Sequence, residues 1–489
     1  MVNRNGSTDS ANGISGLNGS IEESLVFGHT SQGAEIHATL LRLNRFSAVF
    51  EVYSPAVVLR ASEVLSDFKI VFRDRTVYSG RAVVRSLIET GLTVICEATL
   101  NESSWMDVTF ALETIGSGKL REEFSGFMRS WQKLYRVLPE YKVIIADMHS
   151  FLSDLRLWLD QVELGIRSSP GGDRIRLEQE ATEELAGPIL PCVNELFERF
   201  ERVAGSIEEE FRPAHWTYMR RQLHPLILSA PFPYRAFSKP LGYAGDYEVV
   251  NMMARNAHEG GSLFAKIVHT WFLRQPPAQA HRNRIDQLTR WLEIETLRVS
   301  RTGRRARILN VACGPAQEIQ NFVITSPISE RAACTLIDFN QETLDYAQAT
   351  LNDLRNRHSR DMPVDYVRKS VHQILKEAGK PVPLPPDRQY DFVYCAGLFD
   401  YLSDQVCHRL MDIMYDWVAP EGLVAVTNVE PSNPLRHGMD HLLDWHLIYR
   451  TGPELERLKP TRADRELCRI SSDTTGVNVF LEVRKPAHA

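Results

Sequence analysis

Apolar and polar positions alternate in short runs over the first hundred residues, a pattern typical of half-buried β-strands. The runs are rich in β-branched and aromatic side chains, and turn residues separate them. The predicted strands cover residues 36–41, 48–53, 68–72, 82–87 and 92–96. Because several short strands follow one another so closely, residues 25–105 are predicted to form a small β-barrel.

Beyond this region the hydrophobic period lengthens to three or four residues, which indicates amphipathic helices. The predicted helices cover residues 127–135, 144–159, 179–211 and 279–295. The run Ser-Ser-Pro-Gly-Gly at 168–172 interrupts the pattern, and so does Pro276-Pro277. Residues 106–260 are therefore predicted to form a helical domain.

Strands and helices alternate in the last part of the chain, residues 261–489. The predicted strands cover residues 307–311, 334–338, 364–367, 390–395, 422–429 and 478–483. This alternation predicts a parallel, doubly wound sheet that binds ligands at the carboxyl ends of its strands. The predicted fold class is thus multidomain, with a small N-terminal β-barrel, a central α-helical region and a C-terminal α/β, Rossmann-like domain.

The composition is that of an ordinary globular protein, because 43% of the 489 residues are hydrophobic and 24% are charged. A net charge of −6 and the lack of a basic block argue against a nucleic-acid partner. No apolar run approaches the roughly 20 residues that a membrane span needs. Residues 1–24 are rich in Gly, Ser and Asn and are predicted to be a disordered tail without a signal peptide.

The chain has 7 cysteines, and they are scattered without a Cys-x-x-Cys pair. This spacing predicts neither a disulfide framework nor a zinc site. The simplest interpretation is a reducing, cytoplasmic location.

The segment Phe237–Glu248 combines two glycines, two tyrosines and an aspartate between helical stretches. Glycine permits unusual backbone angles and a close approach of the backbone to a ligand. Tyr243 and Asp246 are therefore candidates to line a substrate pocket under this loop. The alternative is a loop that only turns a corner.

The run Arg307–Ile319 is the most informative part of the chain. An apolar strand ends there at a turn of small residues, and a helix follows. A helix N-terminus presents free N–H groups and the positive end of a dipole to a ligand. The next predicted strand ends in Asp338, whose carboxylate can accept both hydrogen bonds of a ribose diol. A dinucleotide-binding dehydrogenase is the alternative, but its Gly-x-Gly-x-x-Gly run is absent.

From about Gly303 to Pro486 the sequence resembles the class I S-adenosylmethionine-dependent methyltransferases. The matches are the glycine-rich first motif at 308–316, the ribose-binding acid Asp338, the fourth-strand motif at 390–402 and the segment leading into strand five at 417–423. The resemblance implies a seven-stranded sheet with an antiparallel last strand and S-adenosylmethionine as cofactor. Three positions depart from the family pattern: Asn310 replaces the usual acid, and Ala312 and Ala316 replace glycines.

The resemblance also implies which residues bind the cofactor. They are Asn310, Ala312, Cys313, Gly314, Pro315, Asp338, Phe339, Ser370, Val371, Ala396 and Gly397. Ser370 and Val371 stand where many members carry a Gly-Asp pair that holds the adenine amine. Ser370 can still form a hydrogen bond, and Val371 can pack on the adenine ring.

Candidates for the acceptor side follow strands four and five or belong to the 237–248 loop. The catalytic candidates are Tyr243, Tyr401 and His437, and the substrate-binding candidates are Tyr243, Asp246, Phe399, Arg436, His441 and Arg450. An arginine can hold a carboxylate through a fork of N–H donors. His437 is a candidate general base. Its spacing from His441 also permits a metal site on one helix face, but no metal is predicted from this pair.

Residues 239–248 and 441–450, together with the methyltransferase-like segment, resemble bacterial proteins that synthesise 3-hydroxy-fatty-acid methyl ester signals, so-called extracellular factors. This resemblance implies that the acceptor is a fatty-acid carboxylate. One alternative is a methyltransferase that modifies an oxygen, nitrogen or carbon of another natural product. The other is a non-catalytic signalling adaptor with a vestigial methyltransferase domain.

The predicted barrel resembles the PilZ-type barrels of bacterial signalling proteins, which bind cyclic di-GMP. The run Asn44–Phe50 lacks the glycine of that family's second signature, so the barrel is degenerate and a docking or scaffold module is favoured. The expected partners are a small-molecule acceptor and a second copy of the chain, in a homodimer formed through the N-terminal or the helical region.

Overall fold

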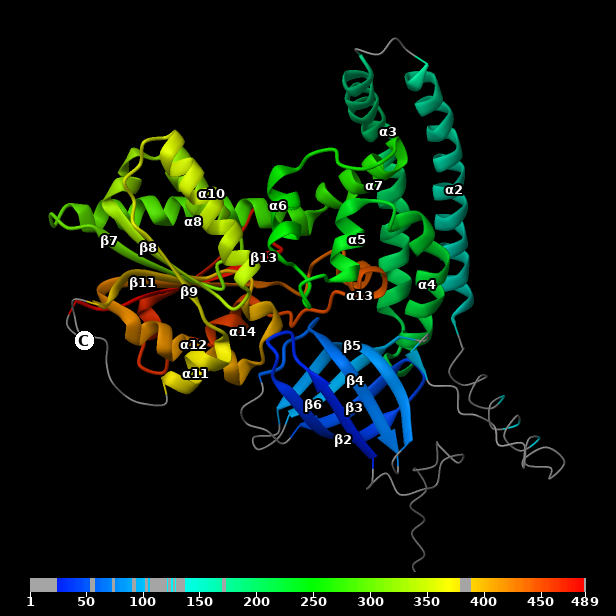
Figure 1. The fold of residues 1–489 in the computed structure, drawn as a ribbon, viewed down its shortest axis with the longest axis horizontal. Helices are drawn as coiled ribbons and strands as arrows, with labels where there is room; N and C mark the ends of the chain where they lie inside the picture. Colours follow the sequence, from blue (N-terminus) through cyan, green and yellow to red (C-terminus); the bar gives the residue numbers. More distant parts are fainter. Residues whose placement is uncertain are drawn as a thin grey trace, which may run out of the picture.

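The computed structural model consists of a barrel, a helical region and a sheet covered by helices, which meet along one seam (Figure 1). It describes residues 24–52, 58–72, 75–89, 94–101, 104–105, 137–168, 173–378 and 388–487, with the single positions 121, 125 and 128. Residues 1–23 of the predicted tail and all but one residue of the predicted helix 127–135 lie outside the described residues, whereas Ser24, the last residue of the predicted tail, begins strand β1. No described helix has an apolar stretch long enough to cross a membrane.

The N-terminal part is a closed antiparallel barrel, as predicted, with the strand order β1-β2-β3-β6-β5-β4. Its strands are β1 (Ser24–His29), β2 (Glu35–Leu43), β3 (Ser47–Val52), β4 (Val64–Phe72), β5 (Arg75–Glu89) and β6 (Val94–Leu100). Alternate side chains of β2 are buried, and Phe50 and Phe68 fill the interior. The strand β1, which the sequence pattern did not single out, pairs with both β2 and β4 and so closes the barrel.

The central part is helical, as predicted. Its helices are α2 (Pro139–Arg167), α3 (Arg174–Gly205), α4 (Arg212–Ile227), α5 (Pro231–Ser238), α6 (Tyr247–Arg255) and α7 (Leu263–Leu273). The helix predicted over 179–211 ends earlier, at Gly205, and a short 3-10 turn (η4, Glu209–Phe211) separates it from α4. Pro213 lies in the first turn of α4 and lacks the N–H that a continuous helix would use there.

The C-terminal part is a seven-stranded sheet in the order β12-β13-β11-β10-β7-β8-β9, with β13 antiparallel to its neighbours. Its strands are β7 (Ala306–Val311), β8 (Ala332–Asp338), β9 (Val364–Arg368), β10 (Tyr390–Cys395), β11 (Val418–Val429), β12 (Cys468–Ser472) and β13 (Asn478–Arg484). The chain runs from β7 to β9 in one direction and returns to β10 on the other side of β7. The carboxyl ends of β7 and β10 therefore flank the point where ligands bind in such sheets.

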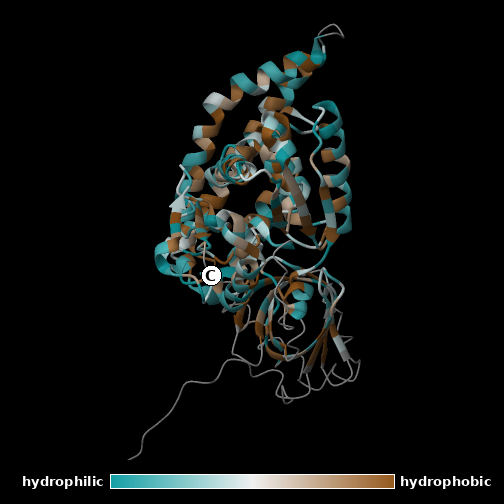
Figure 2. Cartoon of the chain, turned by 90° about the vertical axis from the view of Figure 1, so that its left-hand side faces the viewer, coloured by the Kyte–Doolittle hydropathy of each residue, from teal (hydrophilic) through white to brown (hydrophobic). Residues whose placement is uncertain are grey.

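Helices cover both faces of this sheet. They are α8 (Pro276–Ser300), α9 (Gln317–Thr325), α10 (Gln341–Arg357), α11 (Val371–Glu377), α12 (Asp404–Trp417) and α14 (Gly452–Glu456), with the short turns η5 (Pro327–Arg331), η7 (Phe399–Tyr401) and η8 (Arg465–Leu467). Apolar residues of α8, α9 and α10 pack on one face, and those of α11, α12 and α14 pack on the other. Figure 2 accordingly shows mostly brown strands, whereas the helices mix teal and brown.

One helix from the C-terminal part belongs to the core of the helical region. This helix, α13 (Arg436–Leu443), follows β11, and its Met439, Leu442 and Leu443 pack among apolar residues of α3, α4 and α5. This helix therefore anchors the segment after β11 of the C-terminal part in the core of the helical region.

Candidate functional site

The turn between β7 and α9 has an unusual backbone. Ala312, Gly314 and Ala316 all have positive φ angles, of 58°, 53° and 53°. The left-handed region costs an alanine roughly 1–2 kcal/mol, and strain of this kind is concentrated at functional sites. A side chain on Gly314 would meet nothing within 4 Å, so the backbone there borders open space.

Asp338, at the end of β8, faces this turn. Its Oδ2 accepts a hydrogen bond from the N–H of Gly314 at 3.2 Å, and its Oδ1 accepts one from Asn340 at 3.0 Å. Burial raises the pKa of Asp338, whereas these two backbone donors lower it. A carboxylate has about four acceptor positions, so both oxygens can accept further hydrogen bonds from a ligand.

A cavity opens between this turn, the carboxyl ends of the strands and the helical region. Its volume, counted as room for the centres of water molecules, is about 220 Å³, whereas one water needs roughly 10–15 Å³ by that measure. The predicted cofactor residues that line it are Asn310, Ala312, Cys313, Gly314, Pro315, Asp338, Phe339, Val371, Ala396 and Gly397. Ser370 does not line the cavity, because its hydroxyl caps helix α11.

The family motif usually has an acid at position 310, and here an acid comes from a neighbouring helix. The Nδ2 of Asn310 donates to Oε1 of Glu318 on α9 at 2.9 Å, and the Tyr394 hydroxyl donates to the same oxygen at 2.7 Å. Burial raises the pKa of Glu318. Glu318 also lines the cavity, so its carboxyl lies next to the strained turn.

A basic pair on helix α8 lines the cavity as well. The Nη2 of Arg284 lies 2.7 Å from Nδ1 of His281. Because a guanidinium can only donate, Nδ1 must accept, and the proton of the neutral imidazole is then on Nε2. A Cβ on Gly397 would lie 3.0 Å from Nη1 of Arg284, so the glycine makes room for the guanidinium. Within the part of the chain that the structure describes, Arg284 has no ion pair.

Two of the predicted catalytic tyrosines, Tyr243 and Tyr401, line the cavity. The Tyr401 hydroxyl accepts a hydrogen bond from Nε1 of Trp445 at 3.0 Å, and the Tyr243 ring lies 5.3 Å from that of Phe339. Burial raises the pKa of both tyrosines, which keeps them neutral. Asp400, which precedes Tyr401 in the chain, also lines the cavity, and burial raises its pKa to about 6.

Five of the six substrate candidates, all except Tyr243, do not line the cavity. Arg450 is saturated by Asp404, Asn428 and two backbone carbonyls, one of them that of the buried Phe399. Arg436 stacks on Tyr449 at 4.5 Å. Asp246 caps helix α6 and forms an ion pair with Arg235 at 2.8 Å. These contacts hold the walls of the site together.

His437 does not line the cavity and is half-buried, and His441 is buried in the core of the helical region. Nδ1 of His441 is 2.9 Å from the Tyr141 hydroxyl, and the ring is fully buried. His437 packs near Gly205 of α3, and its backbone N–H donates to Glu201. Burial lowers the pKa of both histidines. In the described ranges no three His, Cys, Asp or Glu side chains are placed to hold a metal ion.

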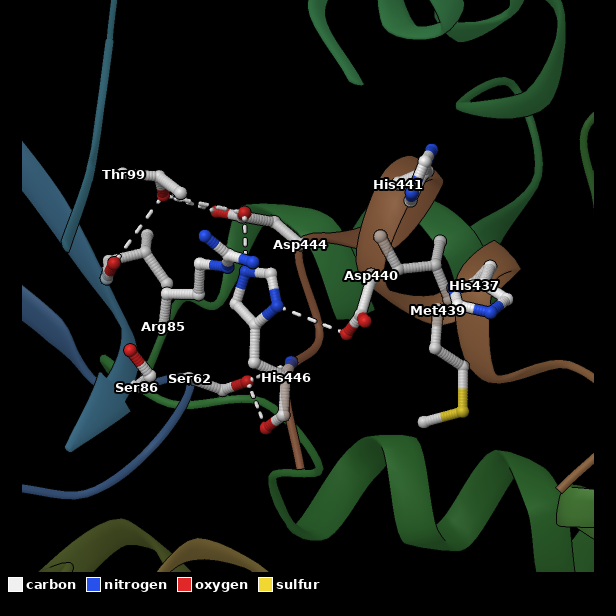
Figure 3. A network of polar contacts seen from close by, with 12 residues as sticks. Ser62, Arg85, Ser86, Thr99, His437, Met439, Asp440, His441, Asp444 and His446 are labelled. Carbon is white, nitrogen blue, oxygen red and sulfur yellow. Dashed lines mark hydrogen bonds and ion pairs between the residues drawn. The ribbon is translucent and has the colours of Figure 1, made fainter. Parts of the chain in front are cut away.

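A polar network joins the segment after α13 to the barrel (Figure 3). The two ring nitrogens of His446 lie 3.0 Å from Asp440 and 3.1 Å from Asp444. The Ser62 hydroxyl of the barrel donates to the carbonyl of His446 at 2.8 Å. Although burial alone lowers the pKa of His446, its hydrogen bonds to the two carboxylates raise it above 6.5. Because a carboxylate oxygen can only accept, hydrogen bonds at both ring nitrogens of His446 require both to carry a proton, as in the imidazolium form.

This network predicts a pH-dependent stability. The raised pKa of His446 means that its contribution to the free energy of unfolding is complete below pH 6.5 and is lost as the pH rises through the folded-state pKa. We expect His446→Gln to remove this part of the pH dependence in urea unfolding measured between pH 5.5 and 9. His37→Gln, at an exposed position of β2, is the control and should leave the profile unchanged. Parallel profiles for wild type and His446→Gln would contradict the prediction.

Sequence reasoning missed several residues of the cavity wall, namely Gln32, Arg60, His281, Arg284 and Glu318. The first two belong to the barrel and the next two to α8, and all four lie far in sequence from the β7–α9 turn. No spacing rule connects them to it. Glu318 lies within the motif segment, where its nearness to Asn310 in sequence was the one available signal.

Comparisons with known proteins give partial likenesses. No protein-family model matches the chain. The uncharacterized protein RP028 of Rickettsia prowazekii (strain Madrid E) is 19% identical over 142 residues, which is 29% of this chain and 50% of that protein. The chain thus spans half the length of this curated relative.

Solved structures resemble the chain in part. A possible exported protein from Bordetella parapertussis has a TM-score of 0.40 and 18% identity, and the match covers 56% of this chain and 97% of that one. The magnesium protoporphyrin IX methyltransferase of Synechocystis PCC 6803 with bound SAH has a TM-score of 0.33 and 10% identity, covering 52% and 100%. The N-methyltransferase NodS of Bradyrhizobium japonicum WM9 has a TM-score of 0.27 and 15% identity, covering 42% and 97%. These TM-scores are too low to transfer a function from the solved structures, so a function for this chain has to be argued from the geometry of its own cavity.

Proposed function

We propose that the protein is a class I methyltransferase that transfers a methyl group from S-adenosylmethionine to a small molecule. One observation carries this proposal: the strained β7–α9 turn and the Asp338 carboxylate face the same large cavity, at the point where the strand order reverses. That combination provides backbone N–H groups, an acceptor for a ribose diol and room for an adenosyl group.

The residues present fit this cofactor. Asp338 would accept hydrogen bonds from the ribose hydroxyls, and the Phe339 ring and Val371 supply apolar surface for the adenine. The open backbone at Gly314 and the N-terminus of α9 suit the carboxylate of the methionine part. The carboxyl of Glu318 suits its amino group. When bound, the cofactor would supply a sulfonium methyl group, which a nucleophile attacks in line while the neutral thioether, S-adenosylhomocysteine, leaves.

The rest of the cavity suits an acceptor with a large apolar body. Its wall contains many apolar side chains from the helical region and from the turn after β11, among them Phe232, Met253, Phe272, Leu435, Met439, Leu443 and Leu447. Such a wall excludes water and strengthens electrostatic interactions inside. The chain's own contribution is therefore alignment of the acceptor and exclusion of water.

The pair Arg284 and His281 supports a carboxylate as the reacting group. The guanidinium fork and the Nε2–H of the histidine are donors only, and they lie beside Gly397 at the end of β10. A carboxylate is already a nucleophile and needs no general base. An acid with a long apolar chain fits both features, so we propose a fatty-acid carboxylate, including the hydroxylated acids that the sequence resemblance implies.

Asp400 favours a second candidate function. Its carboxyl lines the same cavity, and burial raises its pKa to about 6, within the range of a general base near neutral pH. A base at this position suits the methylation of a hydroxyl or an amine of another natural product. The two functions differ in the group that accepts the methyl.

Calorimetry with S-adenosylmethionine tests the cofactor, and mass spectrometry of the reaction mixture tests the acceptor. We expect saturable heat with the cofactor and, with long-chain acids, a product that is one methylene heavier. Matched long-chain alcohols should react more slowly than the acids. The absence of any heat would favour a non-catalytic adaptor, and faster reaction of the alcohols would favour the Asp400 route.

A further inference from the structure

Two turns of the barrel reach the cavity that the sheet and the helical region enclose. Gln32, between β1 and β2, and Arg60, just before β4, both line it. The backbone next to Arg60 is bonded to both other parts: the Ala61 N–H donates to the Tyr401 carbonyl at 3.0 Å, and the Val64 N–H donates to that of Gly242 at 2.7 Å. The barrel therefore borders the cavity, and it is hydrogen-bonded both to the C-terminal part and to the helical region.

The Arg60 side chain is held in place by buried partners of the barrel. Its Nη2 donates to the Ser31 hydroxyl at 2.8 Å and lies 3.5 Å from Oε1 of Glu63. Glu63 is fully buried and also accepts from the backbone N–H groups of Ser31 and Arg60. A guanidinium fixed in this way loses little freedom when it binds a ligand.

One part of this guanidinium has no partner among the residues that the structure describes. Only 6% of Arg60 is exposed, and its buried Nε–H meets no hydrogen-bond acceptor in those described ranges. Its Cζ lies 4.5 Å from the Phe339 ring and 5.7 Å from that of Tyr243. Buried donors are satisfied in most proteins, so this donor beside Phe339, at the wall of the cavity, is available to an acceptor atom of a ligand.

We propose that Arg60 is a cofactor-binding residue supplied by the barrel, and that it closes the adenosyl end of the cavity. This inference rests on the proposed function, which places the ribose at Asp338 and the adenine at Phe339. The chemistry fits, because the ribose oxygens and the adenine ring nitrogens are neutral acceptors that a guanidinium N–H can bind. Glu63 and Ser31 act as positioning residues for Arg60.

The consequence is a reciprocal coupling between the barrel and the cofactor site. If the barrel supplies a contact to the cofactor, the cofactor strengthens the docking of the barrel by the same factor. Hydrogen exchange at the Ala61 and Val64 amides reports this docking, because both donate across the seam. The barrel is then a part of the cofactor site as well as a docking module.

Calorimetry of the full chain with S-adenosylmethionine tests the proposal. Arg60→Met should weaken binding about tenfold or more, because hydrogen bonds from charged groups are the stronger ones. Arg60→Lys should weaken it less, since it keeps the charge but lacks Nε–H and the planar face. The control is Arg81→Met, another barrel arginine at the seam, which donates to the Ser238 carbonyl and does not line the cavity. It should bind within about twofold of wild type.

Hydrogen exchange is the second readout. Cofactor should slow exchange at Ala61 and Val64 in wild type and in Arg81→Met, and should do so less in the Arg60 variants. If Arg60→Met does not fold, Arg60→Lys carries the test. Wild-type affinity in the folded Arg60 variants, together with weakened binding in Asp338→Ala, would overturn the role of Arg60 but leave the proposed cofactor site intact. Absence of binding in the wild type would instead overturn the proposed function.

Discussion

Asp338→Ala should weaken S-adenosylmethionine binding by roughly 1–3 kcal/mol, or about 5- to 150-fold. The change leaves the ribose hydroxyls without their acceptor. It also frees the Gly314 and Asn340 N–H groups that the carboxylate now holds, so the strained turn loses its anchor. For this reason we expect an effect near the upper end of the range. Isothermal titration calorimetry measures it directly.

Two further variants sharpen this test. Asp338→Asn keeps one acceptor oxygen and should give an intermediate affinity. Asp365→Ala removes an exposed aspartate from the adjacent strand β9 and should bind as wild type does. Thermal unfolding of each variant separates a lost ligand contact from a lost fold. Full affinity in a folded Asp338→Ala protein would remove Asp338 from the site.

Arg284→Met should reduce kcat/KM for a long-chain acid by roughly 30- to 700-fold. Loss of Arg284 leaves the carboxylate in an apolar cavity without its charged donor, which costs about 2–4 kcal/mol. The affinity for S-adenosylmethionine should change little, because Arg284 lies on the acceptor side. Steady-state kinetics with acids of one chain length, alongside cofactor calorimetry, gives both quantities.

The control for this variant is Arg290→Met, at an exposed position on the same helix α8, which should retain full activity. A neutral alcohol of the same chain length provides a second comparison, since Arg284→Met should affect it much less than the acid. An equal loss on both substrates would show that Arg284 acts only on the shape of the cavity. No loss on the acid would leave Asp400 as the residue that prepares the acceptor.

The local pattern of apolar and polar residues was sufficient to predict most of the helices and strands. Buried residues recur every two positions in β2 and about every four positions in α2. This repeat follows from the geometry of the single strand or helix, so it can be seen in the local sequence. The strand-end motif was also visible, because Asp338 and the β7–α9 turn follow directly from two apolar strands. The barrel and the alternation of strands and helices in the C-terminal part were predicted for the same reason, whereas the antiparallel last strand was implied only by the resemblance to class I methyltransferases.

The prediction of which side chains line the acceptor side of the cavity was less successful. His437, His441, Arg436 and Arg450 belong to a segment rich in groups that can do chemistry, but the structure directs them into the core or against neighbouring residues. Such residue types serve equally well as structural partners. Sequence pattern does not distinguish a saturated arginine from a free one, because the partners come from other elements.

By itself, the sequence determined the three kinds of architecture, the motif turn and the acid opposite it, since each depends on neighbours along the chain. Only the tertiary structure decided that Arg284 from α8 and Arg60 from the barrel line the same cavity as Asp338. The physical reason is that a cavity forms where separate elements pack, and its wall is set by three-dimensional contacts between residues that are far apart in sequence.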